Sequence, residues 1–315
     1  MSDIQRAAVF GGGTAGRGVA RVLAAAGIEV LLVESSREAL DRALDALRDA
    51  MARDIGRWAL TEAERDAQLA RIEGTHGTTD LRGVQLVAEA IGENRREKTA
   101  LLAELDGRAD PEAFIFLNTS TISITELAAG LPLERQRRIL GLHFLHPVSR
   151  TPLVELIRGQ ESSPGTVEAA RRLAARLGKE VIEVAEYPGY ITTRLTLVLI
   201  NEAIQLVMEG VATRDAVDRA MRLRLGASHG PLALADEIGL DSVHRALESM
   251  WEGLGLPQFR PAPLLRRMVT EGWLGEKSGR GFYRYDSSGR RIPEPEDLAR
   301  PGVALGSLED DRRGE

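Results

Sequence analysis

The sequence has 315 residues, 43% of them hydrophobic, and its 41 Lys and Arg residues are outnumbered by 47 Asp and Glu, giving a net charge of −6. This length is typical of two domains with substantial cores, and the acidic balance disfavours nucleic-acid binding, which clustered cations drive. Because the chain has no cysteine, disulfides, a thiolate nucleophile and Cys-ligated zinc are excluded. No apolar run approaches the ~20 residues that a bilayer requires, and no signal peptide is recognisable. We therefore expect a cytoplasmic protein that binds or transforms small molecules.

The sequence opens with the pattern of a dinucleotide-binding βαβ unit. The apolar run Ala7–Phe10 leads into a glycine-rich turn, a helical segment and a second strand, Glu29–Val33, which ends at Glu34. In the G-x-G-x-x-G pattern the glycines allow a tight turn, close approach of a pyrophosphate and close helix packing. Glu34 stands where a carboxylate accepts the ribose hydroxyls of NAD and repels the 2′-phosphate of NADP, although Arg37 nearby favours NADP. The predicted cofactor contacts here are Gly11, Gly13, Thr14, Ala15, Gly16 and Glu34.

The next segments predict the rest of this first domain. Residues 36–73 have a polar, amphipathic helical pattern with arginines along it, which indicates either a solvated face or a surface for an anionic substrate tail. Four apolar runs then predict strands separated by helices: Val84–Ile91, Ala113–Leu117, Ile139–Phe144 and Leu153–Ile157. The alternation predicts a doubly wound, Rossmann-type α/β domain over residues 1–185.

Beyond Tyr187 the periodicity becomes helical, which predicts a smaller all-α domain over residues 186–285. The remaining tail, 286–315, is charged, contains Gly and Pro and has no aromatic residue, so we expect it to be peripheral or disordered. The expected helices are Thr193–Glu209, Ala216–Leu223, Leu232–Ile238, Ser242–Trp251 and Leu264–Glu271.

Two polar residues interrupt apolar strands of the first domain. Glu155 lies within Leu153–Ile157, and His143 lies within the run Leu140–Leu145. A buried carboxylate is costly unless a cation or a donor meets it, so the two residues suggest a pair. Glu155 would then fix the imidazole tautomer and stabilise its protonated form, which leaves the other ring nitrogen as a general base.

A hydroxyl cluster follows the strand that ends at Leu117. Ligands collect at the carboxyl ends of strands in open α/β sheets, so these hydroxyls are candidates for contacts with substrate or cofactor. Thr121 and Ser123 suit the capping of the following helix better. Ser120 is therefore the predicted ligand-binding residue.

These motifs resemble, over residues 5–285, those of the L-3-hydroxyacyl-CoA dehydrogenase family. The resemblance is collinear, and beyond the glycine-rich unit it includes Glu89-Ala90-Ile91-Gly92-Glu93-Asn94 with Lys98, Asn118-Thr119-Ser120, Gly141-Leu142-His143-Phe144, Leu153-Val154-Glu155, Pro188-Gly189-Tyr190, Asn201-Glu202-Ala203, Gly230-Pro231 with Gly239-Leu240-Asp241, and Gly279-Arg280-Gly281-Phe282-Tyr283.

The resemblance implies an NAD enzyme, usually a homodimer through its helical domain, that oxidises a 3-hydroxyacyl thioester. It implies that His143 is the catalytic base, that Glu155 orients it, and that Ser120 contacts both substrate and cofactor. Glu93 and Lys98 would flank the nicotinamide ribose. His146 and Lys277 would occupy further cofactor-contacting positions.

The chain departs from the family on the substrate side. His146 and Thr193 replace asparagines, and the residues at two CoA-contacting positions are Ala50 and Arg57, of which Arg57 can still bind phosphate. Thr193 keeps a hydroxyl for the substrate but has a shorter reach than asparagine. The base and the NAD site stay intact, so these changes indicate an altered substrate within the same chemistry.

Three readings of the function remain open at this point. CoA is the preferred carrier of the acyl group, and an acyl carrier protein of polyketide biosynthesis is the alternative. Oxidation of a free hydroxy acid, as in related carnitine and gulonate dehydrogenases, would need cations such as Arg150 or Arg194 near the site. A nucleotide-binding protein without turnover is the reading from a different class, and the His143–Glu155 pair argues against it.

Overall fold

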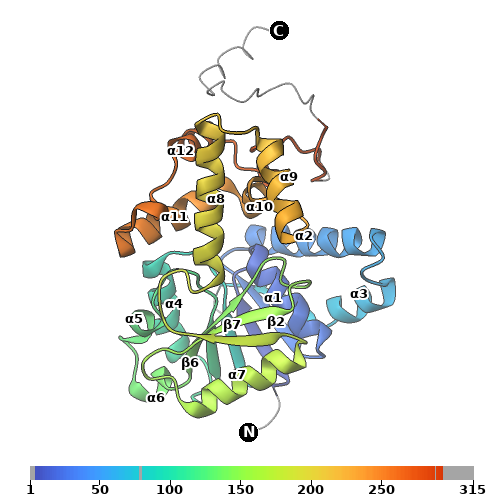
Figure 1. The fold of residues 1–315 in the computed structure, drawn as a ribbon. Coiled ribbons are helices and arrows are strands. Elements are labelled where there is room, and N and C mark those ends of the chain that lie inside the picture. Colours follow the sequence, from blue (N-terminus) through green and yellow to red (C-terminus); the bar gives the residue numbers. More distant parts are fainter. Residues whose placement is uncertain (1–3, 78–79, 288, 294–315) are drawn as a thin grey trace. The chain divides into compact units, whose positions relative to one another are not determined.

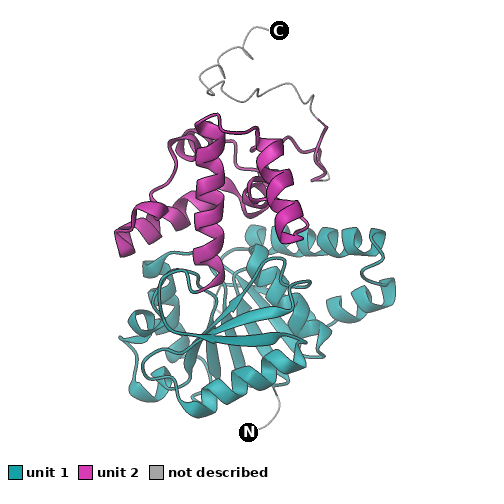
Figure 2. Ribbon diagram, in the orientation of Figure 1, with its two compact units in different colours: residues 1–190 teal, residues 191–315 magenta. Residues whose placement is uncertain are grey.

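The computed structural model describes residues 4–77, 80–287 and 289–293. The chain divides into two compact units, Met1–Tyr190 and Ile191–Glu315 (Figure 2). Most of the tail that we expected to be peripheral or disordered lies outside the described residues. None of the helices in the described ranges combines the length and apolarity that a membrane crossing requires.

Unit 1 is built on an eight-stranded sheet with the order β3-β2-β1-β4-β5-β6-β7-β8. Six neighbouring strands, β3, β2, β1, β4, β5 and β6, run parallel to one another. Strand β7 is antiparallel to β6, and β8 is parallel to β7. This order is that of a doubly wound Rossmann-type fold and confirms the predicted fold class. The strands are β1 (Arg6–Phe10), β2 (Glu29–Glu34), β3 (Ile72–His76), β4 (Leu86–Glu89), β5 (Phe114–Leu117), β6 (Ile139–Phe144), β7 (Leu153–Ile157) and β8 (Glu180–Val184).

Helices cover both faces of this sheet (Figure 1). Alternate strand residues point to opposite faces, so Ala7 and Val9 join the core with α1 and α7, while Ala8 and Phe10 join the core with α4 and α5. Burial on both faces explains why the central strands are continuous apolar runs in the sequence. The helices of unit 1 are α1 (Thr14–Ala25), α2 (Arg37–Gly56), α3 (Glu62–Leu69), α4 (Arg95–Asp106), α5 (Ile124–Ala128), α6 (Leu133–Gln136) and α7 (Pro164–Arg176).

The prediction of helix throughout residues 36–73 is wrong in two places. The helical segment is broken between α2 and α3, where Thr61 caps α3 through a capping box with Glu64. From Ile72 the chain forms strand β3 instead of continuing as helix. The predicted strand Val84–Ile91 is also too long, because β4 spans only Leu86–Glu89.

Unit 2 is all-α, as predicted, and each of the expected helices is present. Its core contains buried residues of α8 and α11 together with the aromatic side chains of Phe282, Tyr283 and Tyr285. The helices are α8 (Thr192–Met208), α9 (Arg214–Leu225), α10 (Pro231–Ile238), α11 (Leu240–Leu254), α12 (Pro263–Thr270) and the short 3₁₀ turns η1 (Pro257–Phe259) and η2 (Glu276–Ser278).

Candidate active site

The glycine-rich turn joins the carboxyl end of β1 to the start of α1. Gly11 adopts φ +96°, and a Cβ on it would lie 2.6 Å from the carbonyl oxygen of Ala90. A Cβ on Gly16 would lie 1.8 Å from the carbonyl oxygen of Gly11. Both positions therefore require glycine so that the turn can pack closely against its neighbours.

Gly13 is different, because the fold itself does not require glycine there. Its backbone angles of −64° and −175° are open to any residue, and a Cβ would meet nothing within 4 Å. Gly13 caps the twelve-residue helix α1 without a side-chain hydrogen bond. The open space at a helix N-terminus fits the pyrophosphate of a dinucleotide, whose charge the helix dipole and free N–H groups stabilise. Thr14 and Ala15 follow in the first turn of α1.

Glu34 ends β2 beside this turn, where its carboxylate accepts hydrogen bonds from the backbone N–H groups of Gly12 and Ser35. The carboxylate thus lies against the glycine-rich turn, as a ribose-binding acid requires. Arg37, the residue that could favour a 2′-phosphate, forms an ion pair with Asp41 on α2. The residues at the end of β2 and the start of α2 therefore fit NAD.

His143 and Glu155 face each other across β6 and β7. The two residues are register partners in this antiparallel pair, so their side chains lie on the same face of the sheet. His143 Nδ1 lies 2.8 Å from Glu155 Oε2. Both are buried as predicted, with 6% of His143 and 0% of Glu155 exposed. The reversal of strand direction at β7 is what places a carboxylate opposite the imidazole.

Ser120 lies at the second ring nitrogen of the same histidine. Its Oγ is 3.0 Å from His143 Nε2. When Nδ1–H donates to Glu155, Nε2 carries the lone pair and accepts a hydrogen bond from the Ser120 hydroxyl. Three side chains, from the β5–α5 loop, β6 and β7, thus form one hydrogen-bonded chain with the imidazole at its centre, an arrangement that can serve as a general base.

Glu93 and Lys98 lie in the segment that joins β4 to β5, near the carboxyl ends of these strands. Glu93 precedes α4 and accepts hydrogen bonds from the loop that carries Ser120. Lys98 Nζ is 2.6 Å from Glu89 Oε1 and 3.9 Å from Glu93 Oε2. The prediction that Thr121 helps to cap α5 is wrong, because its hydroxyl donates a hydrogen bond to Glu93. The cap of α5 is Ser123.

The buried Glu89–Lys98 pair is a feature that we did not predict from the sequence. Both side chains are 0% exposed, and burial raises the pKa of the Glu89 carboxyl while the Lys98 ammonium opposes that rise. The pair fixes the ammonium at the carboxyl ends of β4 and β5. Glu89 ends an apolar strand just as Glu155 interrupts one, so the same sequence signal could have revealed it.

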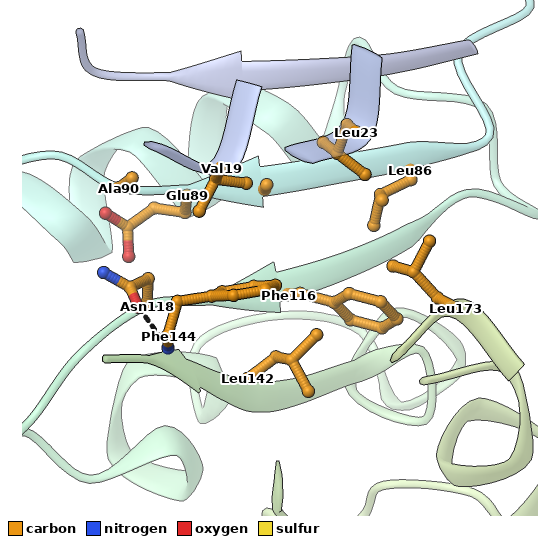
Figure 3. Close-up of a pocket in the computed structure, with 11 residues that line it drawn as sticks. Val19, Leu23, Leu86, Glu89, Ala90, Phe116, Asn118, Leu142, Phe144 and Leu173 are labelled. Carbon is orange, nitrogen blue, oxygen red and sulfur yellow. Dashed lines mark hydrogen bonds between the residues drawn. The ribbon is translucent and has the colours of Figure 1, made fainter. Parts of the chain in front are cut away.

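A small cavity lies behind this edge, between the sheet and helices α1 and α7 (Figure 3). Most of its lining is apolar, including Val19, Leu142 and Leu173. The amide oxygen of Asn118 accepts a hydrogen bond from the N–H of Phe144, which connects β5 to β6 next to His143 (Figure 3). The cavity is part of the packed core. Its polar lining residues, Glu89 and Asn118, lie at the carboxyl ends of β4 and β5.

The remaining predicted site residues lie in both units. Within unit 1, Arg57 is exposed at the C-terminal end of α2, and His146 is exposed in the turn after β6. Within unit 2, Thr193 lies in the first turn of α8, and Lys277 forms an ion pair with Asp241.

The two regions of the chain match known families separately. Residues 6–187 match the NAD binding domain of 3-hydroxyacyl-CoA dehydrogenase, and residues 189–285 match its C-terminal domain. The chain is 40% identical to the probable 3-hydroxybutyryl-CoA dehydrogenase of Bacillus subtilis over 284 residues, which covers 90% of this chain and 98% of that protein.

Solved structures are similar to this chain over most of its length. FadB2 of Mycobacterium tuberculosis has a TM-score of 0.85 at 37% identity, with 90% of this chain and 100% of that one covered. The (S)-3-hydroxybutyryl-CoA dehydrogenase PaaH1 of Ralstonia eutropha has a TM-score of 0.79 at 38% identity, with the same coverage.

Proposed function

This chain belongs to the 3-hydroxyacyl-CoA dehydrogenase family, and from that premise we propose that it oxidises a 3-hydroxyacyl thioester with NAD, with His143 as the general base. The observation that carries the proposal is the hydrogen-bonded chain Ser120–His143–Glu155 at the carboxyl edge of an NAD-binding domain. The His143–Glu155 pair argues against a nucleotide-binding protein without turnover.

The proposed chemistry follows from the two ring nitrogens of His143. Nε2 accepts the proton of the substrate 3-hydroxyl, and the Glu155 carboxylate stabilises the imidazolium that results. The hydride leaves C3 as the carbonyl forms, and NAD, when bound, supplies the hydride acceptor. The Ser120 hydroxyl, which bonds the same nitrogen, is in position to hold the substrate oxygen. In unit 2, we propose that the Thr193 hydroxyl contacts the thioester.

We propose that NAD is held by the glycine-rich turn at Gly11, Gly13 and Gly16, with Thr14 and Ala15 at the start of α1. Glu34, Glu93 and Lys98 would contact its ribose groups, and His146 and Lys277 are the further proposed contacts. The open space at Gly13 and the carboxylate of Glu34 against the turn support this arrangement.

For the carrier we propose CoA. Arg57 supplies a cation for its phosphates, and the neighbouring Trp58 is 96% exposed at φ +59°, so its aromatic face is available for stacking on a purine. A double variant, Arg57→Ala with Trp58→Ala, should raise KM for acetoacetyl-CoA about tenfold while leaving KM for acetoacetyl-pantetheine unchanged. Equal KM values for the CoA substrate in wild type and variant would contradict this role.

The direct test of the function is NADH oxidation with acetoacetyl-CoA, followed by absorbance. We expect sustained turnover. No turnover in a sample that binds NADH would overturn the CoA proposal, and the same assay with an acetoacetylated carrier protein and with free 3-keto acids would then identify the substrate class. Failure with all of these would leave the non-catalytic reading.

We also propose a homodimer formed through unit 2. Several large apolar side chains of this unit are exposed, which supports an interface there. Light scattering during gel filtration should give twice the mass of the chain, whereas a single-chain mass would contradict the proposal. The exposed residues are Leu195 (67%), Val211 (60%), Leu223 (70%) and Leu225 (59%).

A further inference from the structure

Glu93 makes an unusual set of contacts for a residue whose expected partner is a ribose. Its Oε1 accepts the hydroxyl of Thr119 at 2.6 Å and the backbone N–H of Ser120 at 3.0 Å. The same oxygen accepts the backbone N–H of Thr121 at 2.9 Å and its hydroxyl at 3.0 Å. Four donors from three consecutive residues thus converge on one carboxylate oxygen. We call this arrangement the Glu93 clamp.

The clamp holds the residue that touches the base. Ser120 lies in the irregular segment between β5 and α5, where no helix or strand fixes its backbone. Besides Glu93, the N–H of Gly189 reaches this segment, at the carbonyl of Ser120. Hydrogen bonds to a carboxylate are stronger than those between neutral groups. The clamp is therefore a principal constraint on where the Ser120 hydroxyl meets His143 Nε2.

The second oxygen of the same carboxylate is placed differently. Oε2 lies 3.9 Å from Lys98 Nζ, and the Glu93 side chain is 37% exposed. The Lys98 ammonium, held by Glu89, is thus within ion-pair distance of the Glu93 carboxylate as well. One carboxylate can thus hold the loop through Oε1 and still offer Oε2 to a ribose hydroxyl.

We propose that Glu93 is a positioning residue for the base: it acts on His143 through Ser120, in addition to any contact with the cofactor. The inference rests on the proposed function, since it assumes that His143 is the base. Placement of the base and binding of the nicotinamide end then depend on the same side chain.

The test compares Glu93→Ala, Glu93→Gln and Ser120→Ala in the full-length protein. The first readout is the ¹⁵N resonance of His143 Nε2 in the absence of cofactor and substrate, assigned with His143→Ala among the five histidines. We expect E93A to move this resonance in the direction that S120A does. E93Q should leave it in place, because its amide oxygen accepts the same hydrogen bonds.

The second readout is kcat at saturating NADH and substrate. We expect a loss of at least about tenfold in E93A and a smaller loss in E93Q, because small misplacements of a base are costly and the amide keeps the hydrogen bonds without the charge. Thr121→Val removes one hydrogen bond of the clamp without removing the charge, and it should move the resonance in the same direction by less. Glu97→Ala, which removes an exposed carboxylate bonded to Asn94, is the matched control.

An E93A protein with a wild-type His143 resonance, a wild-type kcat and only weaker NADH binding would overturn the proposal and leave Glu93 as a cofactor contact. The resonance is measured without turnover, so it tests the clamp even where acetoacetyl-CoA is not a substrate. A failure of acetoacetyl-CoA to react would contradict the proposed function and leave the clamp to be judged by the resonance.

Discussion

Both units bury carboxylates, but the groups that meet them differ. In unit 1, Glu155 faces the imidazole of His143 and Glu89 faces the ammonium of Lys98, so each of these two acids pairs with a basic side chain. In unit 2, Asp218 and Asp236 accept hydrogen bonds from backbone N–H groups and tyrosine hydroxyls.

The acids of unit 2 therefore join segments of chain. Asp218 accepts the N–H groups of Leu232 and Ala233 at the start of α10, as well as the hydroxyl of Tyr283. Asp236 accepts the N–H groups of Phe282 and Tyr283. The comparison teaches that burial alone does not mark a catalytic acid, because the buried carboxylates of unit 2 join segments of the chain.

The largest effect should come from the imidazole. His143→Ala removes the proposed base, so kcat should fall by about 10³-fold, while NADH binding stays close to wild type. Steady-state rates and NADH fluorescence titration measure the two quantities. His229→Ala, an exposed histidine of unit 2, is the control and should retain its rate. A comparable rate in H143A would falsify the assignment of the base.

Glu155→Gln tests the carboxylate behind the imidazole. The amide oxygen can still accept the Nδ1 proton, but the charge that stabilises the imidazolium is lost, so kcat should fall by about 10²-fold. Stability in urea should change little by comparison, and unchanged turnover would place Glu155 with the structural acids of unit 2.

Asp236 should reveal itself through pH instead. Burial raises its pKa to about 6, against hydrogen bonds from Phe282, Tyr283 and Tyr285 that lower it. The folded carboxyl binds its proton more tightly than the unfolded one, so the stability that it contributes is present below about pH 4 and is lost as pH rises through about 6. Across this window, wild type should lose roughly 2 kcal/mol relative to Asp236→Asn. Parallel urea titrations from pH 4 to 7 would show no such divergence if Asp236 titrates normally.

Asp218→Asn sharpens the contrast with Glu155. One of the two carboxylate oxygens becomes an amide NH₂ group facing donors, which should cost about 1–2 kcal/mol of stability. Turnover per folded molecule should stay unchanged, in the opposite pattern to E155Q. Urea unfolding and an active-site titration by NADH give the two numbers, and a kcat loss without destabilisation would contradict the structural role.

The smallest effect is expected at Tyr190, a buried residue whose ring lies beside the imidazole of His143. It lies in the left-handed region at φ +47°, and its ring centroid is 5.6 Å from that of His143. Its buried hydroxyl has no hydrogen-bond partner among the residues that the structure describes. Tyr190→Phe keeps the ring contact and removes the unsatisfied hydroxyl, so stability should rise by up to about 1 kcal/mol at unchanged kcat. A fall in kcat would instead show that the hydroxyl meets a bound group.

The central fold could be predicted because its strands are buried on both faces. β1, β5 and β6 are apolar runs, and the glycine-rich turn marks the βαβ unit. β3 and β8 could not, because they are the two edge strands of the sheet and carry exposed polar residues such as Glu73 and Glu183.

The site was predictable to the extent that its residues break local rules. His143 and Glu155 are polar residues in apolar strands, but their pairing depends on the antiparallel register of β7, which no local pattern encodes. The Glu93 clamp depends on two loops 26 to 28 residues apart in the chain, so its hydrogen bonds follow only from the tertiary structure.

The scarcity of lysine gives this protein a practical property. Of its three lysines, Lys98 is fully buried in an ion pair, and the Lys179 ammonium is buried against the carbonyl oxygens of Val148 and Thr151. Lys277 has 47% of its side chain exposed. Among the lysine side chains, an amine-reactive dye should therefore label the folded protein at Lys277, which gives a fluorophore at a single defined position of the helical unit.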